Sequence, residues 1–314
     1  MSIDGGGSLD VLIAGDLFVD MVMTGFRSWP PSPGEEVFAE RFCREIGGGA
    51  AITACGMARL GANVGVAGVV GQSDGPWLIE SLQAGGVNTS AIKQSAVEPT
   101  AVTVSVSSAT DRTFLTYMGA NRELPAWLRE LSSHSDFANT RHVHLACAPE
   151  PAEVEDVFRQ VRAQSRTLSV DAGWHPDWLT DARCKEALRC VDVFLPNERE
   201  AAVMTGEREP QRILEAFQKL GLTTVALKLG TRGAALLAHE KIMFCKPLNV
   251  ASVDSTGAGD CFDAGFLFAW LRGDAPQRCL KTAAICGALS TRSLGGIAGF
   301  ATIAELNAEL EMQR

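Results

Sequence analysis

Hydrophobic residues alternate along the chain between two kinds of segment. Short continuous apolar runs are typical of strands that are buried on both faces of a sheet. They predict strands at Val11–Ala14, Val64–Val70, His142–Ala146, Leu168–Asp171, Val191–Leu195 and Val225–Leu229. Longer stretches between them predict helices near Ala50–Leu60, Pro76–Ala84, Pro151–Ala163, Arg183–Leu188, Glu198–Met204 and Gln211–Leu220. The alternation predicts an α/β fold of three layers, with a mainly parallel sheet flanked by helices.

The last third of the chain is predicted to be mostly helical. Its helices are expected at Asp260–Leu271, Gln277–Ser290 and Ile303–Met312. We find no internal repeat or low-complexity linker, so we expect a single domain over residues 1–314.

Two segments, residues 21–46 and 99–119, interrupt the alternation of strands and helices. The first ends in the extended-looking stretch Glu36–Cys43. The second holds two predicted strands, Ala101–Ser107 and Thr113–Met118, on either side of a turn at Asp111. We expect these segments to form a small antiparallel sheet that acts as a lid. The alternative is two surface hairpins without motion.

Composition excludes several classes of function. The 314 residues are 46% hydrophobic and 21% charged, which is ordinary for a globular protein. A net charge of −9 argues against a nucleic-acid surface. No apolar run approaches the ~20 residues that span a bilayer, and the start of the chain lacks a signal-peptide pattern. We therefore expect a cytoplasmic protein without nucleic-acid or membrane partners.

Cysteine and histidine give no metal-binding pattern. The nine cysteines form no C-x-x-C pair, and most lie among apolar residues, so we expect reduced core thiols. His142 and His144 share one face of a predicted strand without a third ligand nearby. We therefore predict no zinc site.

The strongest chemical signal is the sequence D-S-T-G-A-G-D, which runs from Asp254 to Asp260. Gly257, Ala258 and Gly259 leave backbone N–H groups uncovered where a helix begins, and such a turn attracts anions. Asp260 would repel a bound phosphate there, unless it accepts a proton from an attacking hydroxyl group. Asp at a helix start is ordinarily a cap, but the G-A-G-D context favours a catalytic base.

Four further motifs occur in an order that resembles the ribokinase, or PfkB, family of carbohydrate kinases over essentially the whole chain. They are Gly15–Asp20 after the first strand, the glycine-rich Gly47–Ala54, the N-x-x-E element Asn197–Glu200, and Lys228–Gly233. The resemblance implies a ribokinase-like fold and an ATP-dependent kinase that phosphorylates a hydroxyl group of a small sugar-like molecule. Neither a dinucleotide fingerprint nor a P-loop is present, so phosphate binding falls to the turn before Asp260.

The resemblance also assigns roles to individual residues. On the substrate side it implies Asp16, Asp20, Gly48, Gly49 and Ile52. On the ATP side it implies Asn197, Lys228, Gly230, Thr231, Gly233 and Thr256. Glu200 would hold Mg²⁺ through water. Asp254 either binds K⁺ or only hydrogen-bonds its own loop. The resemblance also leads us to expect a homodimer that forms through the lid.

The sequence departs from the family pattern on the substrate side. Ile52 stands where relatives carry an Asn that hydrogen-bonds substrate hydroxyl groups, and Phe18 and Cys147 stand where ribokinases use polar groups. Each unpaired hydroxyl group would cost ~1–3 kcal/mol. One interpretation is a substrate with an apolar part, such as a nucleoside; the other is that Ile52 belongs to the core. A kinase-like binding protein without turnover is a further alternative, which Asp260 and Glu200 disfavour.

Overall fold

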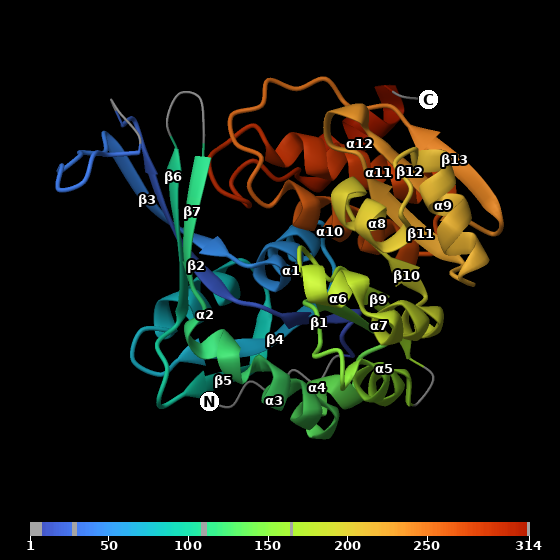
Figure 1. The fold of residues 1–314 in the computed structure, drawn as a ribbon, viewed down its shortest axis with the longest axis horizontal. Coiled ribbons are helices and arrows are strands. Elements are labelled where there is room, and N and C mark those ends of the chain that lie inside the picture. The colour runs from blue at the N-terminus through green and yellow to red at the C-terminus, as the bar shows by residue number, and fades with distance from the viewer. Residues whose placement is uncertain (1–7, 27–29, 108–111, 164–165, 313–314) are drawn as a thin grey trace.

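A nine-stranded sheet runs through the part of the chain that the structure describes (Figure 1). The computed structural model describes residues 8–26, 30–107, 112–163 and 166–312. The strand order is β13-β12-β11-β10-β9-β8-β1-β4-β5. The strands are β1 (Val11–Gly15), β4 (Val64–Gly71), β5 (Asn88–Ser95), β8 (His142–Ala146), β9 (Thr167–Val170), β10 (Val193–Phe194), β11 (Thr224–Lys228), β12 (Ala234–Ala238) and β13 (Lys241–Cys245). Neighbours from β5 to β11 run parallel, and β12 and β13 extend the sheet in antiparallel pairs.

Helices cover both faces of this sheet, which explains why β1 and β4 are buried along their whole length. One core lies under α1 (Gly49–Arg59), α2 (Pro76–Ala84), α10 (Ala258–Leu271), α11 (Pro276–Ser290) and α12 (Ile303–Met312). The other lies under α3 (Leu124–Glu130), α4 (Ser135–Ala138), α5 (Val154–Arg162), α6 (Pro176–Thr180), α7 (Ala182–Ala187), α8 (Glu198–Thr205) and α9 (Pro210–Lys219). The predicted three-layer fold is confirmed.

A second, four-stranded sheet stands beside the main body, at the left of Figure 1. We call this sheet the lid; its order is β3 (Arg41–Gly47), β2 (Phe18–Thr24), β6 (Ala101–Ser107) and β7 (Arg112–Tyr117). The two outer pairs are antiparallel, as expected, whereas β2 and β6 run parallel. Part of segment 21–46 (residues 27–29) and the predicted turn at Asp111 lie outside the described residues.

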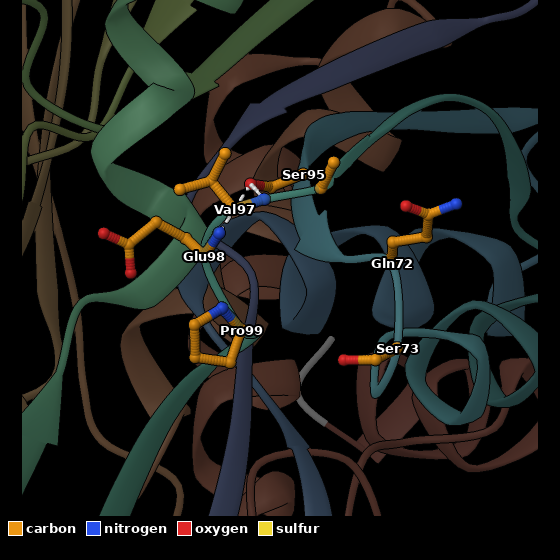
Figure 2. Close-up of a pocket in the computed structure, with 7 residues that line it drawn as sticks. Gln72, Ser73, Ser95, Val97, Glu98 and Pro99 are labelled. Carbon is orange, nitrogen blue, oxygen red and sulfur yellow. Dashed lines mark hydrogen bonds between the residues drawn. The ribbon is translucent and has the colours of Figure 1, made fainter.

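The lid joins the main sheet through the chain that follows β5. There Ser95–Pro99 help to line a hollow of about 290 Å³ before β6 begins at Ala101 (Figure 2). The Ser95 hydroxyl oxygen accepts hydrogen bonds from the backbone N–H groups of Val97 (3.2 Å) and Glu98 (2.9 Å). These bonds fix the turn that leads from β5 into β6. We therefore interpret the hollow as part of this connection between the main sheet and the lid.

Most cysteines and both strand histidines are buried inside the protein. All nine cysteines are free thiols, and all except Cys43 and Cys190 are buried. His142 and His144 are fully buried, and each ring lies within hydrogen-bonding distance of the Ser169 hydroxyl (2.7 and 2.8 Å). Within the described ranges, we find no helix with the length and hydropathy of a membrane span.

Candidate active site

Two cavities lie beside the start of α10. The N-cap residue Gly257 has a φ of 69°, a backbone conformation that residues other than glycine rarely adopt. Ala258 and Gly259 line one cavity, of about 530 Å³, and Asp260 lines a second, of about 190 Å³. Consecutive residues of one helical turn thus face different cavities.

The larger cavity contains most of the residues that were predicted for the nucleotide. Lys228, Gly230, Thr231 and Gly233 line it from the end of β11 and the turn that follows. Much of the remaining wall is apolar: Pro247, Leu248, Val250, Phe262, Ala284 and Ala288. Asn197 and Thr256 do not line it. A mostly apolar wall beside an anion-binding turn suits an adenine ring attached to phosphates.

The smaller cavity lies where the strand order reverses, beyond the carboxyl ends of β1 and β8, which is the usual ligand position in parallel α/β sheets. Its wall consists of Asp16, Phe18, Gly49, Ala146, Cys147, Asp171, Ala172, Gly173, His175 and Asp260. Phe18 and Cys147, two of the three departures from the family pattern, are both in this wall.

Three consecutive glycines between the lid and α1 allow acidic groups to approach the backbone. A Cβ atom on Gly47 would collide with the Asp20 carboxylate, and one on Gly48 with the Asp16 carbonyl oxygen. A Cβ atom on Gly49 would lie 3.0 Å from Oδ1 of Asp260. The positive φ and the backbone contact of Gly48 require glycine there, whereas Gly47 and Gly49 leave room for the carboxylates of Asp20 and Asp260.

Asp260, in the first turn of α10, is linked to α1 by a hydrogen bond. The Thr53 hydroxyl group of α1 donates a hydrogen bond to the Asp260 carbonyl oxygen (3.2 Å). Burial, and next the negative charge of Asp171, raise the pKa of Asp260 to about 7, while Lys228 opposes this shift. A carboxyl group with a pKa near neutrality is a better proton acceptor than an ordinary Asp.

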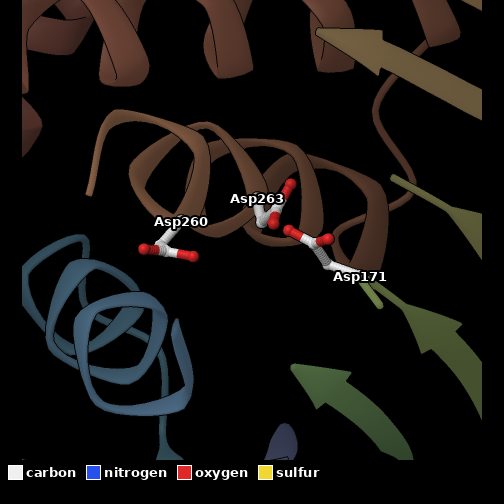
Figure 3. Close-up of side chains that lie close together, drawn as sticks. All are labelled: Asp171, Asp260 and Asp263. Atoms are coloured by element: carbon white, nitrogen blue, oxygen red, sulfur yellow. The ribbon is translucent and has the colours of Figure 1, made fainter. Parts of the chain in front are cut away.

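Lys228 is clamped between two carboxylates. Its Nζ lies 2.7 Å from Oδ2 of Asp171 and 2.8 Å from the carboxylate of Asp263. Figure 3 shows Asp171 and Asp263 next to each other and Asp260 apart from them, on the side toward α1. Carboxylate oxygens of the three acids lie within 4.8 Å of one another, a spacing that could hold a metal ion. The Lys228 ammonium already neutralises two of them, so we assign no metal to this group.

Asp16 and Asp20 both carry raised pKa values. Burial raises the pKa of Asp16 to about 6. Burial, followed by the charges of Asp254 and Glu45, raises the pKa of Asp20 to about 6. Asp20 does not line the smaller cavity; its carboxylate packs on Gly47.

Asn197 and Glu200 form a reciprocal cap at the start of α8. The Glu200 backbone N–H donates to the Asn197 side chain (3.0 Å), and Oε2 of Glu200 accepts from the Asn197 backbone N–H (2.9 Å). Burial, followed by the charge of Asp171, raises the pKa of Glu200 to about 7. Glu200 lines neither cavity.

Asp254 fixes the loop that precedes α10. Its Oδ1 accepts hydrogen bonds from the backbone N–H and the hydroxyl group of Thr256, both at 2.8 Å. Its Oδ2 accepts one from the Gly295 backbone N–H (2.9 Å). The carboxylate thus supports the turn that carries Gly257.

Ile52 lies behind the anion-binding turn and does not line the smaller cavity. Its side chain is 3% exposed. Cβ atoms placed on Gly257 and Gly296 would lie 3.0 and 2.7 Å from its Cδ1 atom. The packing favours the interpretation of Ile52 as a core residue.

Comparisons with known proteins identify the family of the chain. The model of the pfkB family of carbohydrate kinases matches residues 11–303. A 2-dehydro-3-deoxygluconokinase of Bacillus subtilis (strain 168) is 28% identical over 87% of this chain and 89% of its own length. An ATP-dependent ribose-1-phosphate kinase of Halopiger xanaduensis is 30% identical over 89% of this chain and 91% of its own. The nucleoside kinase of Methanocaldococcus jannaschii superposes with a TM-score of 0.82 over 98% of this chain and 100% of its own, at 20% identity. The chain belongs to the pfkB family of carbohydrate kinases.

Proposed function

We propose that this protein transfers the γ-phosphoryl group of ATP to a hydroxyl group of a small sugar or nucleoside, with Asp260 as the general base. The observation that carries the proposal is the position of Asp260. Gly259 faces a cavity suited to ATP, and Asp260 faces a smaller cavity, lined by three aspartates, that suits the acceptor. The reacting groups would meet at this turn, which is the positioning that phosphoryl transfer requires.

The chemical step uses few protein groups. The acceptor hydroxyl group loses its proton to the Asp260 carboxylate, and its oxygen forms a bond to the γ-phosphorus as the bond to the β-phosphate oxygen breaks. The N–H groups of the Gly257–Gly259 turn and the N-terminal end of α10 would stabilise the transferred charge. The products are ADP and the phosphorylated acceptor.

Magnesium and potassium are part of the proposal. Mg²⁺ prefers oxygen ligands and often keeps its waters, so we assign it to the Glu200 carboxylate through water, although both oxygens of that carboxylate also accept hydrogen bonds from Asn197. When bound, Mg²⁺ would neutralise phosphate charge. A potassium ion beside Asp254 would further support the anion-binding turn. Equal rates in Na⁺ and K⁺ at matched ionic strength would remove potassium and leave Asp254 its loop-fixing role.

A homodimer through the lid is also proposed. Phe42, Phe114, Leu115 and Tyr117 of the lid are all exposed. Apolar side chains gathered on one small sheet often mark a protein interface. Sedimentation equilibrium would test this; a monomer at micromolar concentration would contradict it.

The decisive test of function is ATP consumption with a panel of sugars and nucleosides. Wild-type protein should form ADP with at least one acceptor, and Asp260→Asn should fold normally but lose nearly all turnover. Asp274→Asn, outside both cavities, serves as a control and should retain activity. Absence of acceptor-dependent ADP with the whole panel would instead favour a binding protein without turnover.

A further inference from the structure

The acceptor cavity, by which we mean the smaller cavity, is acidic. Three aspartates line it, Asp16, Asp171 and Asp260, and none of the described residues in its wall is a lysine or an arginine. Asp20 adds a fourth carboxylate close enough to raise the pKa of Asp260. An acceptor bound here would therefore be surrounded by carboxylates.

Among the described residues, two cationic groups that contact the cavity wall or its neighbours are already engaged. The Lys228 ammonium is held by Asp171 and Asp263 at 2.7 and 2.8 Å. The Arg199 guanidinium stacks on the ring of Trp174 at 3.7 Å. His175 also lines the cavity, and desolvation of its ring lowers its pKa, which disfavours the cationic form.

These surroundings separate neutral acceptors from anionic ones. Ionised carboxylates only accept hydrogen bonds, and the hydroxyl groups of a neutral sugar can donate them. A phosphate or carboxylate group would meet like charges and lose water without gaining a cationic partner, which is strongly unfavourable.

We infer that the acceptor is an uncharged polyhydroxy compound, not a sugar phosphate or a sugar acid. The inference rests on the proposed function and narrows its substrate class. It also distinguishes this chain from its relatives whose names describe a sugar acid or a sugar phosphate as substrate.

Matched acceptors test the inference. At pH 8, kcat/KM would be measured for ribose, methyl riboside and ribose 1-phosphate, and for fructose and fructose 6-phosphate. Methyl riboside carries an uncharged group at the position of the phosphate and so separates size from charge. The same compounds would be titrated by calorimetry in the presence of a non-hydrolysable ATP analogue.

In the pair of compounds that the enzyme uses better, we expect kcat/KM to be at least tenfold higher for the neutral sugar than for its phosphate. The kcat/KM for methyl riboside should lie closer to that for ribose than to that for ribose 1-phosphate. Asp16→Asn, which removes one charge at constant shape, should narrow the ratio. The inference would be overturned if the anionic member of a pair were preferred, or if methyl riboside were used as poorly as ribose 1-phosphate. It would also be overturned if folded Asp16→Asn kept the same ratio of kcat/KM between neutral and anionic acceptors, or if no neutral compound bound. Neutral sugars that bind without any ADP formation would contradict the proposed function and leave the charge preference standing.

Discussion

Gly49 and Asp260 are neighbours across the active site, although 211 positions separate them in the sequence. A Cβ atom on Gly49 would lie 3.0 Å from Oδ1 of Asp260, closer than ordinary van der Waals contact. The missing side chain at Gly49 therefore leaves room for the carboxylate of Asp260, the proposed base.

Gly49→Ala is expected to displace the Asp260 carboxylate and to lower kcat by roughly tenfold to a hundredfold, because small displacements of reacting groups are costly. The melting temperature should change little, since alanine is a better helix former than glycine. Steady-state kinetics and thermal denaturation measure both effects. Gly85→Ala, beyond the end of α2, is the control, and equal kcat values for the two variants would contradict the prediction.

The rate should rise with pH through neutrality. Asp260 must be ionised to accept a proton, and its pKa is raised to about 7, so kcat/KM should fall as the pH decreases below 7. Asp171→Asn removes a charge that raises this pKa, and the ascending limb should move to lower pH. Asp177→Asn, which is exposed, should not move it. A limb at the ordinary Asp pKa in the wild type would refute the assignment.

Lys228→Met should destabilise the protein by about 3–5 kcal/mol, because Asp171 and Asp263 would then be buried without a cation. Urea denaturation measures the free energy of unfolding. The double variant Lys228→Met/Asp263→Asn should recover part of the loss, since one uncompensated carboxylate is removed. A double variant no more stable than the single one would show that the clamp is not electrostatic.

Glu200→Gln should raise the Mg²⁺ concentration for half-maximal rate at fixed ATP by several-fold. Glutamine can still accept the hydrogen bond from the Asn197 backbone, so the cap and the melting temperature should be largely preserved. The exposed Glu209 nearby provides a control through Glu209→Gln. Identical magnesium curves for the two variants would remove Glu200 from the metal site.

Ile52→Asn should mainly lower stability. The side chain is buried, and an amide without a partner there costs about 1–3 kcal/mol in addition to the lost packing. The ranking of sugars against nucleosides by kcat/KM should stay unchanged, because Ile52 does not line the acceptor cavity. A reordered ranking with an unchanged melting temperature would return Ile52 to the substrate side.

The sequence predicts most of the main sheet and its helices because buried strands and packed helices have distinct apolar periods. It does not reveal β5, whose residues N-T-S-A-I-K-Q-S are largely polar. Nor does it reveal the hairpin of β12 and β13. Its turn residues His239 and Glu240 adopt positive φ (49° and 64°) without the Asn-Gly signal usual for such turns.

Within the site, the sequence locates contiguous motifs but not the contacts between them. The anion-binding turn and the glycine-rich motif are local signals. The clamp on Lys228 depends on residues 57 and 35 positions away, which only the fold brings together. One signal is present in the sequence: Asp263 follows Asp260 by three residues, a spacing that places both on one side of a helix.

The lid strands end at the residues that surround the acceptor. Strand β2 begins two positions after Asp16, and β3 ends at Gly47, two positions before Gly49. A change in the angle of the lid would therefore reach a wall of the acceptor cavity and the neighbour of the base together. A molecule that bound only the outer surface of this sheet could thus act as an allosteric inhibitor, without entering either cavity.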